Sequence, residues 1–120
     1  MTLVTLIDDD EAVLESLPDL VKEFGYPVVA FASAETFLLS DAVDRTACLI
    51  LDVTMPGMAG LELWQKLKRR DEAIPVIFIT ACRDEALRAH LLRQGACDCL
   101  FKPFSDNALL SAIKIALGEA

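Results

Sequence analysis

Five short apolar runs, separated by segments of helical character, constrain the fold of this chain most. They are LVTLI (3–7), VVAF (28–31), CLILD (48–52), VIFIT (76–80) and CLF (99–101). None alternates polar with apolar residues, which is typical of parallel strands covered on both faces. Helical patterns lie between and after them, near 11–24, 34–40, 60–70, 83–94 and 106–117. This alternation predicts an α/β fold with an open, doubly wound, five-stranded parallel sheet and right-handed crossovers.

Local signals mark several helix ends. Ser105 or Asp106 can cap the start of the last helix, which Gly118 follows, and Gly95 suits the residue after the helix at 83–94. Pro18 falls inside the first helical pattern, where the missing N–H costs about 3 kcal/mol. We therefore expect a kink there.

Size and composition bound the class of protein. A chain of 120 residues makes one domain, 1–120. Although 54% of the residues are hydrophobic, no apolar run approaches the roughly 20 residues of a membrane span, and the N-terminus lacks the pattern of a signal peptide. We expect a soluble, cytoplasmic protein without membrane contact. Eleven basic against nineteen acidic residues leave a net charge of −8, which argues against direct binding of nucleic acid.

The four cysteines do not form a recognisable metal or redox motif. Cys97 and Cys99 make one C-x-C pair, and Cys48 and Cys82 stand apart. A structural zinc site needs four ligands at regular spacing. We therefore expect buried or half-buried free thiols that pack as small apolar side chains.

Charged and hydroxyl side chains gather where the predicted strands end. Ligand sites of open parallel sheets lie beyond the carboxyl ends of the strands, so these residues should meet at one edge. In strand order they are Asp8, Asp9, Asp10 and Glu11, then Ser33, Asp52, Thr80, and last Lys102 with Pro103. Each alone would be read as a solvated charge or a helix cap. Their convergence predicts a functional site.

The residue types favour phosphoryl transfer. Neighbouring carboxylates repel one another, and oxygen ligands without imidazole or thiolate favour a hard divalent ion, Mg²⁺ first. A metal, an ammonium group and a hydroxyl around one aspartate are the parts that phosphoryl transfer uses. Asp52 is therefore a candidate nucleophile, held rigidly by a buried strand, with Met-Pro-Gly turning the chain away from it.

Four motifs, in order and spacing, resemble the response-regulator receiver domains of two-component signalling, most closely the FixJ-type or LuxR-type transcriptional regulators. The motifs are LIDDDEAV, LDVTMPGMAGLEL, VIFITA and GACDCLFKPF, and the similarity runs from Leu3 to about Leu117. The resemblance implies a flavodoxin-like (βα)5 fold with strand order 2-1-3-4-5.

The resemblance also implies roles for single residues. Asp52 would be the phosphoacceptor, Lys102 the phosphoryl clamp and Thr80 the switch hydroxyl, with a cis bond between Lys102 and Pro103. The implied Mg²⁺ ligands are Asp8, Asp9, Asp52 and the backbone carbonyl of Thr54. Ala81 would leave room for the phosphoryl group, and Thr54 and Cys82 stand at positions that tune the lifetime of the acyl phosphate.

One position departs from the family pattern. Receivers usually carry Tyr or Phe three residues before the lysine as a rotamer switch, and here that residue is Cys99. Phe101 lies on the same strand face two residues later, and our hypothesis is that it partly substitutes. If the Phe101→Ala variant still self-associates on phosphorylation like the wild type, Phe101 has only a packing role.

The implied function is a switch rather than a turnover enzyme. A sensor histidine kinase would phosphorylate Asp52, and the surface of the last two helices and the last strand would change and form a homodimer. FixJ-type receivers normally continue into a helix-turn-helix domain, whereas a free-standing receiver would have the same sequence. DNA contact is expected only through an output domain, if one lies beyond residue 120.

Three alternatives use the same fold. A haloacid-dehalogenase-type phosphatase also has an aspartate nucleophile with Mg²⁺, but it needs a second aspartate where Thr54 stands. A flavodoxin-like cofactor binder needs a phosphate-binding loop after the first strand, where the acidic DDDEA would repel phosphate. A receiver-like module that no longer takes phosphate would not need to keep Asp52, Thr80 and Lys102 together.

Overall fold

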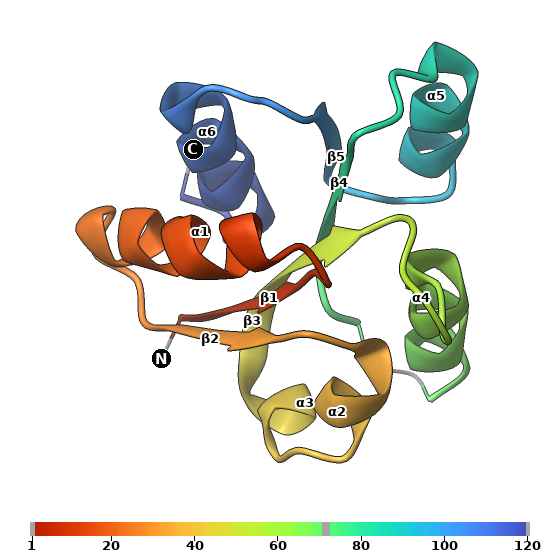
Figure 1. Ribbon diagram of the computed structural model, residues 1–120, viewed down its shortest axis with the longest axis horizontal. Helices are drawn as coiled ribbons and strands as arrows, with labels where there is room; N and C mark the ends of the chain where they lie inside the picture. Colours follow the sequence, from red (N-terminus) through yellow and green to blue (C-terminus); the bar gives the residue numbers. More distant parts are fainter. Residues whose placement is uncertain (1, 71–72, 120) are drawn as a thin grey trace.

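The computed structural model describes residues 2–70 and 73–119. Their five strands form one parallel sheet in the order β2-β1-β3-β4-β5, as predicted (Figure 1). The strands are β1 (Leu3–Ile7), β2 (Val28–Phe31), β3 (Thr46–Asp52), β4 (Val76–Thr80) and β5 (Asp98–Phe101). The helices are α1 (Glu11–Glu23), α2 (Ala34–Leu38), α3 (Ala42–Arg45), α4 (Gly60–Arg69), α5 (Glu85–Arg93) and α6 (Asp106–Ala116).

Helices cover both faces of the sheet. α1 and α6 lie on one face, and α2 to α5 lie on the other (Figure 1). Successive side chains of a strand enter opposite cores: in β3, Ile50 packs with α1 and α6, while Leu51 packs with the helices of the other face. This double burial explains why the strand sequences show no polar alternation.

The second helical segment differs from the prediction of one helix over 34–40. α2 ends earlier, at Leu38, and the short helix α3 follows outside the predicted range, because the Ser40 hydroxyl donates to the carbonyl of Phe37 and accepts the N–H of Ala42. The hydroxyl of Thr46 then donates to the Ala42 carbonyl, and β3 begins at Thr46 rather than at residue 48. Polar side chains at the turn thus outweigh the helical pattern.

The other helix ends follow their signals closely. Ser105, not Asp106, caps α6, since its side chain accepts the N–H of Ala108. Gly95 follows α5 with φ of 109°, and the N–H of Ala96 reaches back to the carbonyl of Leu91 in the pattern of a helix C-cap. α1 runs through Pro18 without a break, and a bend there stays a prediction.

The cysteines are all free thiols, but one departs from the prediction of burial. Cys48 and Cys99 are buried and Cys97 is half-buried, whereas Cys82 is exposed because it lies in the loop after β4. In the described part of the chain, no helix combines the length and the apolar character needed to cross a membrane.

Candidate functional site

Three neighbouring strands end in the same kind of turn. The Asp8 carboxylate after β1 accepts the N–H of residue 10, and the Asp52 carboxylate ending β3 accepts the N–H of Thr54. The Thr80 hydroxyl ending β4 accepts the N–H of Cys82 in the same way. Side chains that bond the backbone two residues ahead fix the start of each loop, so these oxygens are held at the sheet edge.

Three carboxylates meet at this edge. Oxygens of Asp8, Asp9 and Asp52 all lie within 4.8 Å of one another. Asp8 is fully buried and Asp52 is 6% exposed, while Asp9 faces solvent. A set of three oxygen donors that is open on one side fits a hard divalent cation that keeps several waters, and Mg²⁺ is the ion that this donor chemistry suits best.

Lys102 partly neutralises the cluster. Its Nζ lies 2.8 Å from Oδ2 of Asp8 and 3.7 Å from Oδ2 of Asp52. Burial alone would lower the pKa of Lys102, but the hydrogen bond to Asp8 and the charges of Asp52 and Asp8 outweigh it and raise the pKa. The lysine therefore stays cationic.

Asp52 is the strained member of the cluster. Burial, together with the facing Asp8 carboxyl, raises its pKa from the ordinary 3.8 to about 7, against the opposing effects of the Thr54 N–H and Lys102. One ammonium cannot compensate three carboxylates in a low-dielectric site. A divalent cation would relieve this repulsion.

The structure does not bring every predicted residue into the cluster. Thr80 is buried, and within the described residues its hydroxyl bonds Cys82 but no carboxylate of the cluster. Ser33 caps α2 and Asp10 caps α1, so both have the structural role of a helix cap. Ala81 is exposed beside the site.

Cys99 and Phe101, the two positions considered for the aromatic switch, lie on the face of the sheet that α5 covers. Cys99 is buried, and Phe101 is half-buried against the same core. The guanidinium of Arg83 lies 6.0 Å from the centre of the Phe101 ring. The Lys102–Pro103 peptide bond is cis, in agreement with the resemblance.

The loop after β3 is supported from two sides that sequence reasoning missed. Gly60 packs directly on the end of β3: a Cβ there would overlap the backbone carbonyl of Asp52. Glu35 of α2 accepts the N–H of Met58 at 3.3 Å, next to Gly57 with φ of 74°. Glu35 lies 17 residues before Asp52, and no spacing signal reveals such a contact. Gly60, however, is part of the MPGMAG motif, so its position could be read from the sequence.

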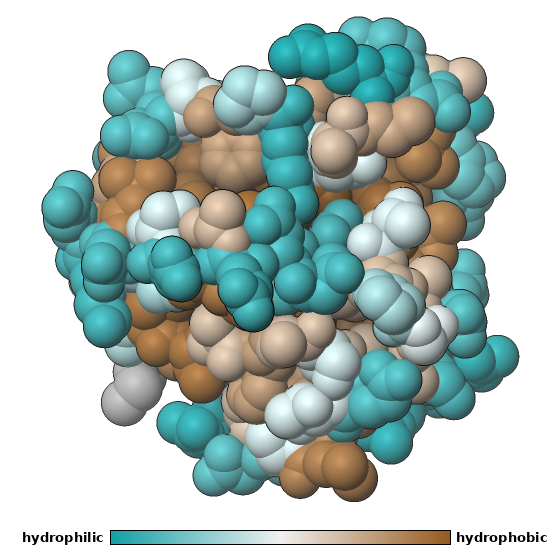
Figure 2. Space-filling view, in the orientation of Figure 1, coloured by the Kyte–Doolittle hydropathy of each residue, from teal (hydrophilic) through white to brown (hydrophobic). Residues whose placement is uncertain are grey.

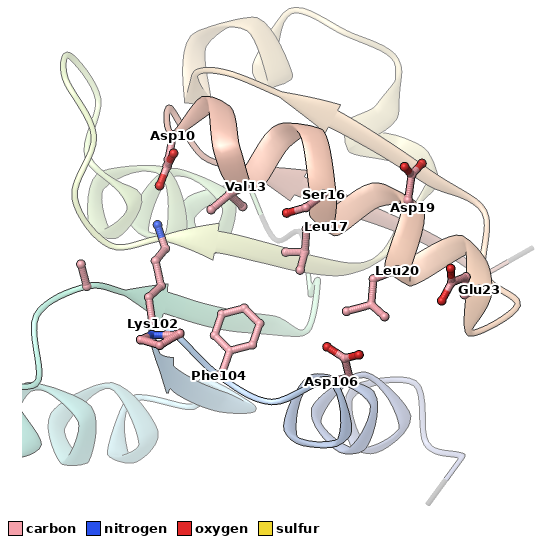
Figure 3. A pocket seen from close by; sticks show the side chains of 12 residues that line it. Asp10, Val13, Ser16, Leu17, Asp19, Leu20, Glu23, Lys102, Phe104 and Asp106 are labelled. Atoms are coloured by element: carbon pink, nitrogen blue, oxygen red, sulfur yellow. The ribbon is translucent and has the colours of Figure 1, made fainter.

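A groove opens beside the cluster between α1 and the segment after β5. It has a volume of about 660 Å³, with Val13, Leu17, Leu20 and Phe104 as apolar lining and Asp10, Asp19, Glu23 and Asp106 as acidic lining. The ammonium of Lys102 lies at one end and points toward α1 (Figure 3). Hydrophilic side chains follow the exposed face of α1, with apolar surface between α1 and α6 (Figure 2).

Comparison with known proteins agrees with this geometry. The family "Response regulator receiver domain" matches residues 4–114. The response regulator protein TodT of Pseudomonas putida is 44% identical over 118 residues, covering 97% of this chain and 51% of TodT. The transcriptional regulatory protein FixJ of Azorhizobium caulinodans is 39% identical over 117 residues, covering 98% of this chain and 56% of FixJ.

Solved structures show the same fold. The response regulator StyR superposes with a TM-score of 0.89 at 39% identity, covering 98% of this chain and 59% of that one. FixJ-N superposes with a TM-score of 0.86 at 32% identity, covering 100% and 96%.

The chain spans about half the length of the curated relatives that it matches. Its fold, its three strand-end turns and its acidic cluster all fall within the matched region. The chain belongs to the family of response regulator receiver domains, the signalling modules of two-component systems.

Proposed function

We propose that Asp52 accepts a phosphoryl group from a sensor histidine kinase with the help of Mg²⁺, and that this modification switches a surface of the domain. The observation that carries the proposal is the meeting of Asp8, Asp9 and Asp52 within 4.8 Å, with the Lys102 ammonium against two of them. A nucleophile, a cation site and a fixed positive charge are the parts needed for in-line phosphoryl transfer.

The residues divide the work of transfer. A free oxygen of Asp52 attacks phosphorus while the bond to the imidazole nitrogen of the kinase breaks, and the leaving imidazole takes a proton from solvent. Asp8, Asp9, Asp52 and the backbone carbonyl of Thr54 would hold Mg²⁺, which supplies charge neutralisation at the phosphoryl oxygens. Once Asp52 has become an acyl phosphate, its carboxylate charge is lost, and Lys102 would pair with the phosphoryl oxygens instead.

The product is expected to persist long enough to signal. Thr54 stands where a haloacid-dehalogenase-type phosphatase carries its acid–base aspartate, and a threonine cannot take that role. The acyl phosphate would therefore be lost slowly, at a rate that residues 54 and 82 tune. This supports a switch over a turnover enzyme.

The switched surface would be that of α5, β5 and α6. Thr80 would leave its turn with Cys82 and donate to the phosphoryl group, and the loop that leads to α5 would follow. We infer that the changed surface forms a homodimer in the cytoplasm and that its output is the regulation of transcription. The names of the relatives TodT and FixJ, a response regulator and a transcriptional regulator, support the transcriptional output.

Intact-mass spectrometry after incubation with acetyl phosphate and Mg²⁺ tests the assignment. The wild type should gain one phosphoryl group, and both Asp52→Asn and an EDTA-treated sample should gain none. Asp41→Asn is the matched control: it makes the same change of charge at an exposed aspartate, and it should be modified like the wild type. Equal modification of Asp52→Asn and the wild type would contradict the proposal.

A further inference from the structure

We propose that Arg88 is a positioning residue that couples α5 to the free edge of β5 at Cys99, where receivers usually carry an aromatic switch. The inference rests on the proposed function, because the coupling is expected to respond to phosphorylation of Asp52. It concerns residues outside the acidic cluster: Arg88 of α5, and Asp98 and Cys99 of β5.

Among the residues that the structure describes, β5 is an edge strand, and one side of its backbone has no neighbouring strand. The N–H of Lys102 donates to the carbonyl of Thr80 in β4 at 2.8 Å. The N–H and the carbonyl of Cys99, by contrast, have side-chain partners outside β4. Backbone groups left open at a sheet edge are a liability in folded proteins.

The ion pair of Arg88 and Asp98 lies at this open edge of β5. The N–H of Cys99 donates to Oδ1 of Asp98 at 2.8 Å, and Nε of Arg88 donates to the carbonyl of Cys99 at 3.0 Å. Nη2 of Arg88 lies 3.4 Å from the same Oδ1 and joins the two contacts. Both backbone polar groups of Cys99 are thus satisfied by one guanidinium and one carboxylate.

The tie matters because α5 is loosely packed. Of its residues Glu85–Arg93, all of which the structure describes, Leu91 is the one buried side chain. Arg88 is therefore a main polar attachment of α5 to the sheet. The Arg88 and Asp98 side chains are 39% and 26% exposed, and an ion pair that is this open to water can be broken at small cost.

The chain connects this tie to the candidate site. Thr80 ends β4 and forms its turn with Cys82, and α5 begins only a few residues later with Asp84 as its N-cap. A movement of Thr80 toward a modified Asp52 would pull this loop and shift α5. The guanidinium would then leave Cys99 and free the β5 edge, so that backbone contact does what the aromatic side chain does elsewhere.

Hydrogen–deuterium exchange of segments 85–93 and 98–101, measured with and without acetyl phosphate and Mg²⁺, tests the coupling. In the wild type, modification should speed exchange in both segments by about three- to fivefold, the factor expected for losing an exposed ion pair. Arg88→Met should show the faster exchange before modification and no further change after it, while its mass gain at Asp52 stays that of the wild type.

Two variants separate coupling from general destabilisation. Arg88→Lys should restore part of the phosphorylation-dependent difference, because an ammonium can reach the carbonyl but cannot bridge it to Asp98 as a planar fork does. Arg93→Met, at an exposed arginine of the same helix, should behave like the wild type.

The outcomes distinguish this inference from the proposed function. If Arg88→Met is modified and still shows the wild-type change in exchange, the coupling role is wrong. If the wild type takes no phosphoryl group, the proposed function fails instead. In that case, equal exchange of unmodified Arg88→Met and wild type would also overturn the role of Arg88.

Discussion

Two ion pairs of the domain lie at different depths: one at the ends of the central strands and one between α5 and the edge strand β5. Lys102 and Asp8 approach to 2.8 Å beside the ends of the central strands, with side chains 17% and 0% exposed. Arg88 and Asp98 approach only to 3.4 Å at the β5 edge, where both side chains remain partly in water. Charges in the interior are costly to separate, whereas charges near the surface exchange partners with water easily. Burial thus distinguishes a rigid ion pair at the candidate site from an exposed pair that water can replace.

The largest expected effect comes from crowding the backbone at the end of β3, beside the Lys102–Asp8 pair. Gly60→Ala places a methyl group against the Asp52 carbonyl and should lower the free energy of unfolding by about 3 kcal/mol. Gly95→Ala, in the turn between α5 and β5, meets no atom within 4 Å and should cost about 1 kcal/mol, from its positive φ alone. Urea denaturation measures both, and equal losses would remove the contrast between the two regions.

The next effect depends on pH. Because the pKa of Asp52 is raised to about 7, the folded state binds its proton more tightly than the unfolded chain. Ionisation between the ordinary value of 3.8 and about 7 therefore costs stability, which is lost as the pH rises through this window. In EDTA, Asp52→Asn should gain about 2 kcal/mol at about pH 8 and little at about pH 4.

Asp98→Asn is the matched variant at the β5 edge and should change stability in the opposite direction. Its carboxylate has two partners and no facing carboxylate in the described contacts, so its loss should cost about 1 kcal/mol at about pH 8. A loss of stability in Asp52→Asn at that pH would show that the cluster is not strained.

Double-mutant cycles compare the two ion pairs directly, and the smallest effect is expected for the exposed pair. The cycle of Lys102→Met with Asp8→Asn should give a coupling energy of about 2 kcal/mol, since Lys102→Met leaves the buried Asp8 carboxylate without its cation. The cycle of Arg88→Met with Asp98→Asn should give less than about 1 kcal/mol. Similar coupling energies would mean that depth does not distinguish the two pairs.

Much of the fold could be predicted because its signals are local or periodic. The strands at 3–7, 28–31 and 76–80 have the predicted bounds, since double burial leaves an unbroken apolar run. The short helix α3 was missed, because it depends on the Ser40 and Thr46 hydroxyls bonding carbonyls that only the folded turn presents. Side-chain contacts of this kind have no periodicity.

The candidate site was predictable to the extent that topology places it. Parallel strands bring their carboxyl ends to one edge, so the meeting of Asp8, Asp9 and Asp52 follows from the strand order. The contact of Arg88 with Cys99 was not predictable, because it joins a helix to an edge strand through a flexible side chain. The exposure of Cys82 likewise depends on the path of a loop.

The turns at the strand ends give each central carboxylate two separate duties. Oδ1 of Asp52 holds the N–H of Thr54, and Oδ2 faces Lys102; Asp8 divides its oxygens between its own loop and Lys102 in the same way. A covalent bond formed at Oδ2 of Asp52 would leave Oδ1 in its turn. The backbone that aims the carboxylate would then keep its shape through the reaction, and hydrolysis could restore the free carboxylate without refolding the loop after β3.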